Sequence, residues 1–419
     1  MPLSELDEEL ASHRLFADEA RCREVFARLR AEDPVHLAHA KGYPPFWAVT
    51  KHADVMEVER QNDKFINAPM TFLHEVEEWA QRLKDTNGTG MYVRNLIQMD
   101  GTDHRAMRGL TQAWFMPRNV KQLEETVRTR ATEMVDLMLD TERCDFAKSI
   151  SPWYPLRVIM SLLGMPEERH PDLLILTQKL LAPQDEQAKA MDPVARAIAK
   201  KEVFGAFLGH MNALIDARRA KPEEDLATLL VNAQVDGQPV APSDLLGYFL
   251  VISTAGHDTT ASALAGGLLA LLRNPEQLER LRREPELMAP AVEEILRWTC
   301  PVRHFIRTAT EDYVLRDKQI KKGDQLMMCF PSACFDEELF PDGDQFRIDR
   351  TPNRHLAFGS GVHNCLGQHL ARFELKAFLT EFLQRIDKVE IDGPVEMVAS
   401  NQVSGVKHLP LRYEALVPV

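Results

Sequence analysis

Residues 358–367 read FGSGVHNCLG, and residues 368–386 read QHLARFELKAFLTEFLQRI. Glycine at positions 359 and 361 permits a tight turn ahead of Cys365. After Cys365, apolar residues recur at the spacing of a helix. We therefore expect Cys365 to lie at a helix N-terminus, where unpaired N–H groups and the positive end of the helix dipole favour a thiolate over a thiol.

A thiolate in such a position is a nucleophile, a redox thiol or a metal ligand. A nucleophile needs an oriented base, and His363 lies two residues away in a turn with no evident third group to orient it. A redox thiol needs a resolving cysteine, but no two of the six cysteines have CxxC spacing, which also argues against a zinc ribbon. The glycines suit the approach of a flat, bulky ligand. The residues thus favour a haem-iron thiolate and leave the nucleophile open.

The composition is that of an acidic globular protein. The 419 residues include 50 Lys and Arg against 63 Asp and Glu, which gives a net charge of −13. This charge repels nucleic acid and anionic membrane surfaces, so neither is an expected partner. The first residues, MPLSELDEELASHRLF, lack the basic and then apolar pattern of a signal peptide. We expect a cytoplasmic protein without a membrane anchor.

Helical patterns dominate the chain, which predicts a mainly α-helical fold with a minor β part and a single domain over residues 1–419. The β-containing part is expected mainly at 30–70, 313–330 and 390–412. Asp54 is expected to open a helix after a strand in 44–56. Long helices are predicted at 119–140, 196–219, 243–273, 275–284 and 288–299.

The segment 243–273 is the most apolar part of the chain and is long enough to cross a membrane. Its centre, however, carries His257, Asp258, Thr259 and Thr260, which would be costly in lipid. We interpret it as a buried central helix, capped by Ser243, with a functional site at its midpoint.

The cysteine stretch resembles the signature FGxGxHxCxGxxLA of the cytochrome P450 family. Its fixed positions are matched in order by Phe358, Gly359, Gly361, His363, Cys365, Gly367, Leu370 and Ala371. The resemblance implies the cytochrome P450 fold, with a long central helix over a haem b group. It implies that Cys365 is the iron ligand, that Phe358 packs near the thiolate, that His363 lies near a propionate and that Gly367 lets the chain approach the haem.

The central segment Ala255-Gly256-His257-Asp258-Thr259-Thr260 is similar to the family motif (A/G)Gx(D/E)T(T/S). A threonine that bonds its own i−4 carbonyl in a locally loosened helix would explain part of this pattern. The resemblance implies instead that Ala255 and Gly256 leave room for dioxygen and that Thr259 and Asp258 deliver protons to it. We expect His257 to pack or bond away from the haem.

Two further sets of charged residues match family positions. Glu294 and Arg297 have the spacing of an ordinary exposed helical pair, but the resemblance implies a buried network with Arg350 that supports the cysteine loop. His104 and Arg108 would otherwise lie on a solvated helix face; together with Arg307 and His363 they are expected to hold the haem propionates. Arg372 is expected at the surface near an acidic ferredoxin.

The resemblance implies a haem-thiolate monooxygenase, an oxidoreductase that hydroxylates a substrate with O₂, two electrons and two protons. The chain has no GxGxxG fingerprint and no four-cysteine cluster pattern, so the electrons should come from a separate ferredoxin and its reductase. A peroxygenase that uses hydrogen peroxide and a non-catalytic haem sensor are the alternatives. The protein is expected to be a monomer.

The substrate is expected to be a hydrophobic small molecule, namely a terpenoid, a steroid or an aromatic hydrocarbon. By family analogy several predominantly apolar segments line its pocket. The pocket residues we predict are Phe72, Leu180, Val251, Thr254, Val302 and Val403.

Overall fold

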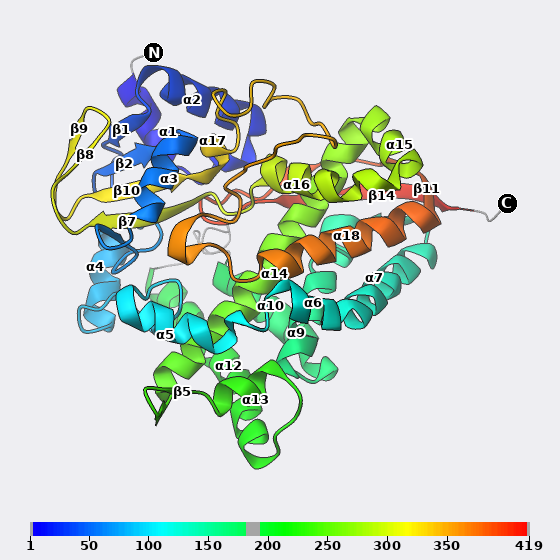
Figure 1. Ribbon diagram of the computed structural model, residues 1–419, viewed down its shortest axis with the longest axis horizontal. Helices are drawn as coiled ribbons and strands as arrows, with labels where there is room; N and C mark the ends of the chain where they lie inside the picture. Colours follow the sequence, from blue (N-terminus) through cyan, green and yellow to red (C-terminus); the bar gives the residue numbers. More distant parts are fainter. Residues whose placement is uncertain (1–2, 182–192, 417–419) are drawn as a thin grey trace.

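The computed structural model describes residues 3–181 and 193–416. A helical layer forms most of the molecule, and a small sheet lies to one side of it (Figure 1). The α-helices of the N-terminal half are α1 Asp7–Ala11, α2 Glu19–Glu32, α3 His52–Arg60, α4 Val76–Asp85, α5 Gly101–Gln112, α6 Pro117–Val120, α7 Glu124–Leu139, α8 Phe146–Ser149, α9 Trp153–Leu163 and α10 His170–Leu181. The remaining α-helices are α12 Pro193–Ala220, α13 Leu226–Val231, α14 Pro242–Arg273, α15 Pro275–Arg283, α16 Met288–Thr299, α17 Phe330–Ala333 and α18 Gln368–Arg385.

The main sheet has five strands in the order β1-β2-β10-β7-β3. β10 pairs parallel with β2 and antiparallel with β7, so a strand from the C-terminal half lies between strands of both halves. The strands of this sheet are β1 Val35–Ala38, β2 Phe46–Val49, β3 Phe65–Ile66, β7 His304–Ala309 and β10 Gln325–Cys329. The smaller sheets and hairpins contain β4 Arg143–Asp145, β5 Gln234–Val235, β6 Gln238–Pro239, β8 Tyr313–Leu315, β9 Lys318–Ile320, β11 Ile386–Ile391, β12 Glu396–Met397, β13 Val406–His408 and β14 Pro410–Ala415.

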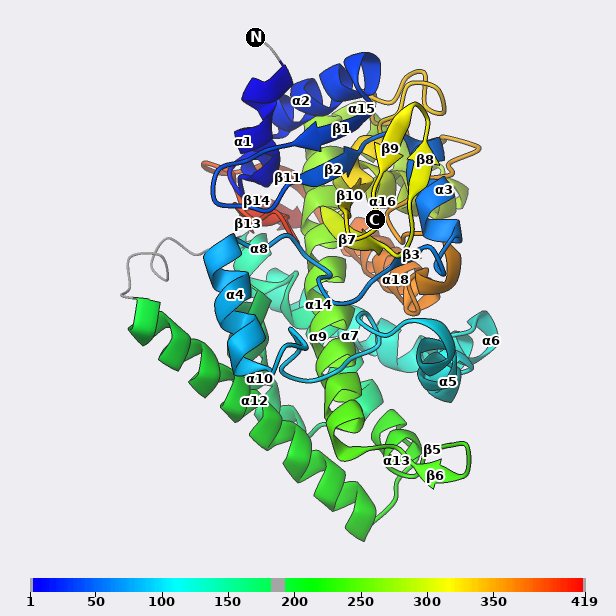
Figure 2. The ribbon, with the colours of Figure 1, turned by 90° about the vertical axis from the view of Figure 1, so that its left-hand side faces the viewer.

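Helix α14 runs through the middle of the molecule (Figure 2). It packs against α9, α10, α12, α16 and α18, which together surround most of its length. Because apolar side chains on nearly all sides of α14 find a partner helix, a helix that is hydrophobic all round is stable in this position.

The predicted fold class is confirmed, and most predicted helices match the structure within a few residues. Three local predictions are wrong, and one strand was missed. The helix after β2 begins at His52 rather than Asp54, and α14 begins with Pro242 at its first position and without a side-chain cap from Ser243. The predicted helix 119–140 is interrupted by a 3₁₀ turn at Lys121–Leu123. Strand β7, which lies between β10 and β3, was not predicted as a strand.

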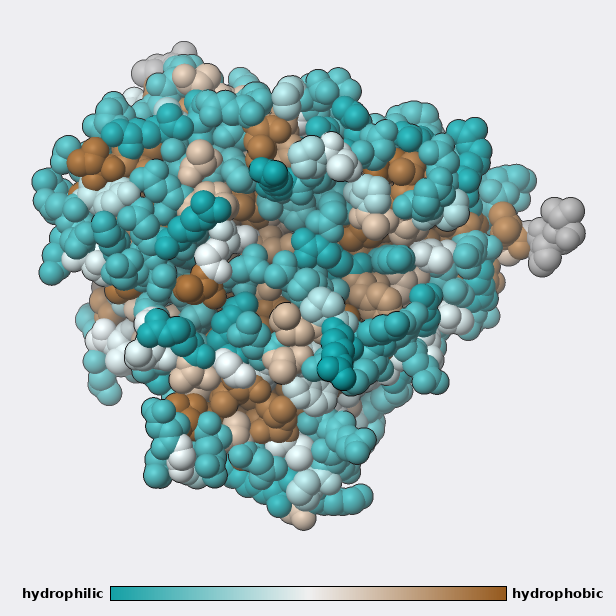
Figure 3. All heavy atoms as spheres, viewed as in Figure 1, coloured by the Kyte–Doolittle hydropathy of each residue, from teal (hydrophilic) through white to brown (hydrophobic). Residues whose placement is uncertain are grey.

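The outer surface is mostly hydrophilic, with separate hydrophobic patches, on the face shown in Figure 3. Within the described residues, no helix is long and apolar enough to span a membrane. The apolar length of α14 is interrupted by the polar residues at its centre, as the sequence indicated.

Candidate haem-thiolate site

The cysteine loop is folded back on itself by two glycines with left-handed backbone angles. Gly359 has a φ of +65° and Gly361 a φ of +66°, a region that other residues rarely adopt. A Cβ atom on Gly361 would lie 2.3 Å from the backbone oxygen of Glu59 on α3. The backbone N–H of Cys365 donates to the Phe358 carbonyl at 2.9 Å and closes the loop. Glycine at 361 is therefore required both by the turn and by the close approach of α3.

Cys365 lies before the helix rather than within its first turn. Helix α18 begins at Gln368, with Gly367 as its N-cap residue. Burial raises the pKa of the Cys365 thiol, and the Gly367 N–H and the charges of Arg108 and Arg372 oppose this shift only in part. Burial thus outweighs the Gly367 N–H and the nearby cations, whereas we expected the helix N-terminus to favour a thiolate. A bound metal cation would deprotonate the thiol outright.

The ring of Phe358 beside the cysteine is held by charged groups. The Arg372 guanidinium carbon lies 4.5 Å from the centre of the Phe358 ring, and Arg372 donates to Glu293 at 2.6 Å. His355 also contacts Glu293, at 3.2 Å. Burial of Glu293 is outweighed by its bonds to His355 and Arg372, which lower its pKa to about 2. Arg372, which we expected at the surface, is thus partly exposed and bound to Glu293, and Glu293 and His355 were not predicted at all.

The structure brings Glu294, Arg297 and Arg350 together in one buried network. Arg297 donates to both oxygens of Glu294 at 2.8 Å, and Arg350 donates to Glu294 at 3.0 Å. Asn353 adds a third side-chain donor at 3.0 Å. The side chains of Glu294 and Arg297 are fully buried. A carboxylate that accepts from three side chains compensates the desolvation of both cations, so the network is stable only when it is complete.

Arg297 also links α16 to the segment that leads to the cysteine loop. Its guanidinium donates to the carbonyl oxygens of Cys334 at 3.0 Å and Gly343 at 2.9 Å. Arg350 donates to the carbonyl oxygens of Asp342 and Gln345, both at 2.8 Å. Two arginines thus satisfy backbone carbonyls of a segment without regular structure, which would otherwise be buried without partners.

His104 and His363 lie side by side, with ring centres 4.0 Å apart. The Nε2 atoms of both are buried and have no hydrogen-bond partner, and the closest carboxylate oxygen to His363, on Asp100, is 3.7 Å away. Arg108 donates to the Asn364 carbonyl at 2.8 Å and lies in the same region. Burial and the neighbouring charges of His363 and Arg108 lower the pKa of His104 to about 4.

Two buried, unpartnered imidazole nitrogens beside an arginine form a suitable receptor for a carboxylate. This arrangement fits a haem propionate. Gly367 fits the haem as well, because a Cβ atom there would meet no protein atom within 4 Å and so no protein neighbour requires glycine. A single cysteine thiolate with these groups is the donor set of a haem-thiolate site.

Arg307 lies in the same region but has a protein partner that we did not predict. It donates to Glu59 on α3 at 2.5 Å, and the second oxygen of Glu59 accepts from the Ser360 N–H at 2.5 Å. Both side chains are almost completely buried. If Arg307 holds a propionate, it must therefore bind the propionate and the Glu59 carboxylate at the same time. No sequence signal connects residues 59, 307 and 360, which meet only in the folded chain.

One face of α14 is open at its midpoint. Ala255 is exposed and Asp258 and Thr259 are partly exposed, whereas the residues between them on the other faces are largely buried. The Thr259 hydroxyl donates to the Ala255 carbonyl at 2.9 Å. Gly256 does not belong to this open face: a Cβ atom there would lie 2.9 Å from Ile159 on α9. The small size of Gly256 thus serves the packing of α14 on α9, and its role beside dioxygen stays a prediction.

The predicted pocket residues come from separate elements of the fold. Val302 and Val403 form an isolated β-bridge, and the Phe72 ring packs 5.1 Å from the ring of Phe305. Leu180 on α10 and Val251 on α14 are partly buried against the helical core. Thr254 donates its hydroxyl to the Leu250 carbonyl at 2.8 Å.

Two polar residues beside the pocket are occupied by protein partners. His304 uses both ring nitrogens, one with the Asn401 carbonyl at 2.6 Å and one with the Leu73 N–H at 3.0 Å. Arg303 donates to the carbonyl oxygens of Thr299 and Cys300. Both ring nitrogens of His304 are thus occupied, whereas the buried Nε atom of Arg303 has no hydrogen-bond partner.

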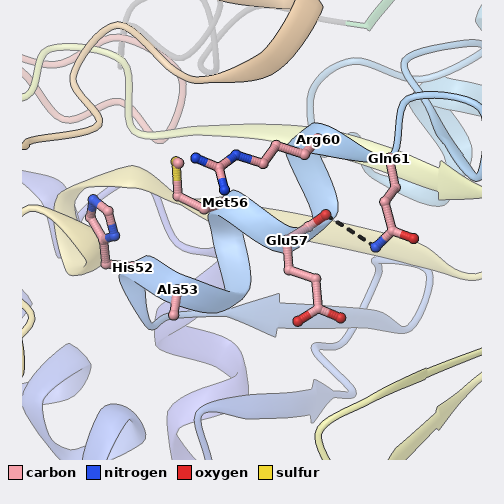
Figure 4. Close-up of a pocket in the computed structure, with 6 residues that line it drawn as sticks. All are labelled: His52, Ala53, Met56, Glu57, Arg60 and Gln61. Carbon is pink, nitrogen blue, oxygen red and sulfur yellow. Dashed lines mark hydrogen bonds between the residues drawn. The ribbon is translucent and has the colours of Figure 1, made fainter.

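A surface hollow of about 480 Å³ lies elsewhere, along one helix (Figure 4). Its lining residues all belong to α3 or directly follow it. They are His52, Ala53, Met56, Glu57, Arg60 and Gln61. The hollow contains none of the predicted site residues, and its lining includes no cysteine.

The mainly helical fold, the cysteine loop and the propionate receptor define a haem-thiolate protein. Residues 72–414 match the family model described as "Cytochrome P450". Cytochrome P450-terp of a Pseudomonas species is 41% identical over 407 residues, which cover 95% of each chain. A steroid C26-monooxygenase of Mycolicibacterium smegmatis is 32% identical, covering 93% of this chain and 90% of the relative. Linalool 8-monooxygenase of Pseudomonas putida is 31% identical, covering 92% and 94%.

Among solved structures, CYP108D1 from Novosphingobium aromaticivorans superposes with a TM-score of 0.91, at 37% identity and with 99% of both chains covered. The chain therefore belongs to the cytochrome P450 family. It is a monooxygenase, and its cofactor is haem b bound through a thiolate.

Proposed function

We propose that this protein hydroxylates an unactivated C–H bond of a terpenoid, with electrons from a separate ferredoxin and its reductase. The observation that carries the proposal is the open face of α14. On an otherwise apolar helix, this face places the small Ala255 beside the Thr259 hydroxyl and the Asp258 carboxylate. A hydroxyl and a carboxylate are sufficient to deliver protons in an apolar pocket.

The bound haem supplies the activation of dioxygen and the transfer of one oxygen atom to the substrate. We assign Cys365 as the iron ligand and His104, Arg108, Arg307 and His363 as the residues that hold the propionates. Phe358, packed under the Arg372 guanidinium, shields the thiolate from water. The network of Glu294, Arg297 and Arg350 keeps the segment before the cysteine loop in place.

Thr259 and Asp258 are assigned as the groups that hold and pass protons. The Thr259 hydroxyl donates to the Ala255 carbonyl of its own helix, so it can rotate without breaking a bond to another element. Asp258 is partly exposed, so its carboxyl can exchange protons with water. A peroxygenase needs no such pair, because hydrogen peroxide carries its own protons, and a haem sensor needs none at all. The pair therefore favours the monooxygenase that uses dioxygen.

The terpenoid class rests on the apolar pocket and on the relatives. Phe72, Leu180, Val251, Val302 and Val403 offer hydrocarbon surface, and both ring nitrogens of His304 are occupied by backbone partners. None of the predicted pocket residues is a cation that could pair with a fatty-acid carboxylate. A terpenoid is the smaller of the two substrate classes named for the relatives, and a steroid is the second candidate.

A ligand screen tests this proposal. Linalool, a steroid and a long-chain fatty acid are titrated into the ferric protein, and the spin-state shift of the haem spectrum is recorded. We expect a saturable shift with the terpenoid and product only when a surrogate ferredoxin, its reductase and NADH are added. A shift with the fatty acid alone would overturn the substrate class, and equal turnover with hydrogen peroxide would overturn the use of dioxygen.

The variant Thr259→Ala tests the proton-delivery role. It should leave the terpenoid-induced spectral shift unchanged and divert reducing equivalents from product to hydrogen peroxide.

The cytoplasmic location and the monomeric state stay predictions. Size-exclusion chromatography with light scattering measures the oligomeric state.

A further inference from the structure

His257, next to the proposed proton-delivery acid, is completely buried and fully bonded. Its Nε2 atom lies 2.8 Å from Asp258 Oδ1 and 3.2 Å from the Thr177 hydroxyl on α10, and its Nδ1 atom lies 2.9 Å from the Ser253 carbonyl oxygen. Adjacent residues on a helix do not normally face each other. The contact forms because the imidazole bends along α14 toward its own i−4 carbonyl and brings Nε2 beside the carboxyl of the next residue.

The hydrogen-bond partners determine where the protons are. The Ser253 carbonyl can only accept, so Nδ1 carries a proton. Thr177 has one hydroxyl hydrogen and directs it to the carbonyl oxygens of Leu173 at 2.8 Å and Leu174 at 3.1 Å. Its lone pairs therefore face Nε2, which must also carry a proton. With both nitrogens protonated, the ring is an imidazolium paired with the Asp258 carboxylate.

The electrostatic balance agrees with this assignment. Burial by itself lowers the pKa of His257, but the adjacent Asp258 carboxylate and the bonds to Asp258 and Ser253 outweigh it, and the pKa is raised. The His257 side chain has no exposed surface, whereas 18% of the Asp258 side chain is exposed. The carboxyl of Asp258 thus lies between the buried proton and water.

We propose that His257 holds the Asp258 carboxylate and stores the proton from which Asp258 is recharged during turnover. This inference rests on the proposed proton-delivery role of Asp258. In the transfer, the Nε2–H bond breaks and an O–H bond forms on Asp258. The ring stays neutral with its remaining proton on Nδ1, bonded to Ser253. Thr177 can then rotate its hydroxyl hydrogen toward Nε2, and water that reaches Asp258 returns the proton. His257 acts through Asp258 and is a positioning residue, not a catalytic one.

A direct test observes the ring. The ferrous CO complex of the holoprotein, labelled with ¹⁵N-histidine, is compared at neutral pH with the variant Asp258→Asn, and the variant His257→Gln identifies the resonance. We expect both ring nitrogens of His257 to be protonated in the unmodified protein and only one in Asp258→Asn. A neutral His257 beside an intact Asp258 would overturn the proposal, independently of any measurement of activity.

A double-mutant cycle tests the function, with linalool as substrate and the surrogate ferredoxin system as electron source. His257→Gln keeps an N–H donor but cannot store a proton, and we expect it to form product about tenfold more slowly. The variant His257→Gln/Asp258→Asn should be no slower than Asp258→Asn alone, because both changes interrupt one path. Effects that multiply, or a His257→Gln variant that turns over normally, would overturn the proposal. If Asp258→Asn itself has normal turnover, the role of Asp258 fails instead.

Discussion

The two sides of the site are held together in different ways. On the cysteine side, hydrogen bonds and ion pairs join separate elements: Glu294 of α16 binds Arg350, and Arg297 binds the carbonyl oxygens of Cys334 and Gly343. On the side of α14, the hydroxyls of Thr254 and Thr259 bond carbonyls of their own helix. Between helices, the contacts there are mostly apolar.

This difference has a physical consequence. Charged bonds between elements are directional and fix the position of the cysteine, whereas apolar contacts tolerate small shifts of one helix on another. The cysteine side is thus suited to hold one cofactor in one geometry.

The largest expected effect is that of Cys365→Ser. Replacement of the thiolate by a weak alcohol donor should abolish monooxygenase turnover and remove the thiolate signature from the spectrum of the reduced CO complex. The matched control is Cys144→Ser. Cys144 is a partly buried cysteine in β4, which pairs with β14, whereas Cys365 lies in the loop before α18. An unchanged spectrum for Cys365→Ser would mean that another cysteine binds the iron.

The variant Glu294→Gln tests the cysteine side next. It leaves the cations Arg297 and Arg350 buried without a counter-charge, so the free energy of unfolding should fall by about 3–5 kcal/mol. Urea denaturation of the holoprotein measures this loss. In the control, Glu124→Gln breaks an exposed pair with Arg128 on α7 and should cost under about 1 kcal/mol. Similar losses for both variants would contradict the contrast between network and surface pair.

On the pocket side, His304 makes stability depend on pH. Burial lowers its pKa to about 4, so the folded state keeps the ring neutral while the unfolded chain titrates near 6.5. Between these values the unfolded state binds more protons, and stability should fall by about 3 kcal/mol as the pH decreases from about 6.5 to 4. Urea midpoints at several pH values measure the slope. In His304→Asn the loss of stability over this pH range should be smaller by about 3 kcal/mol. Equal losses in the variant and the unmodified protein would exclude His304 as the cause.

The smallest expected effect concerns the packing of α14 on α9. Gly256→Ala places a methyl group 2.9 Å from Ile159, which should destabilise the fold by about 1–3 kcal/mol. The second change Ile159→Val should recover part of this loss. Thermal unfolding of the two variants distinguishes a packing role for Gly256 from a role toward dioxygen, since a role toward dioxygen would reduce turnover without a loss of stability or a rescue.

The sequence was sufficient for the elements whose information is local. The apolar run of 243–273 predicts α14, and the glycines at 359 and 361 predict the turn before Cys365, because backbone conformation and helix periodicity are encoded by neighbouring residues. Glu294, Arg297 and Arg350 were identified through a resemblance and not through their spacing. The spacing of Glu294 and Arg297 alone would equally describe an exposed pair.

Only the tertiary structure decided which groups meet across the chain. It pairs Glu59 with Arg307 and Ser360. It places Arg372 over the Phe358 ring and binds Arg372 and His355 to Glu293. It also gives His257 a partner, Thr177, on α10. It also shows that burial raises the pKa of the Cys365 thiol. These contacts join residues up to about three hundred positions apart, and burial depends on all elements at once. Local sequence patterns carry neither kind of information.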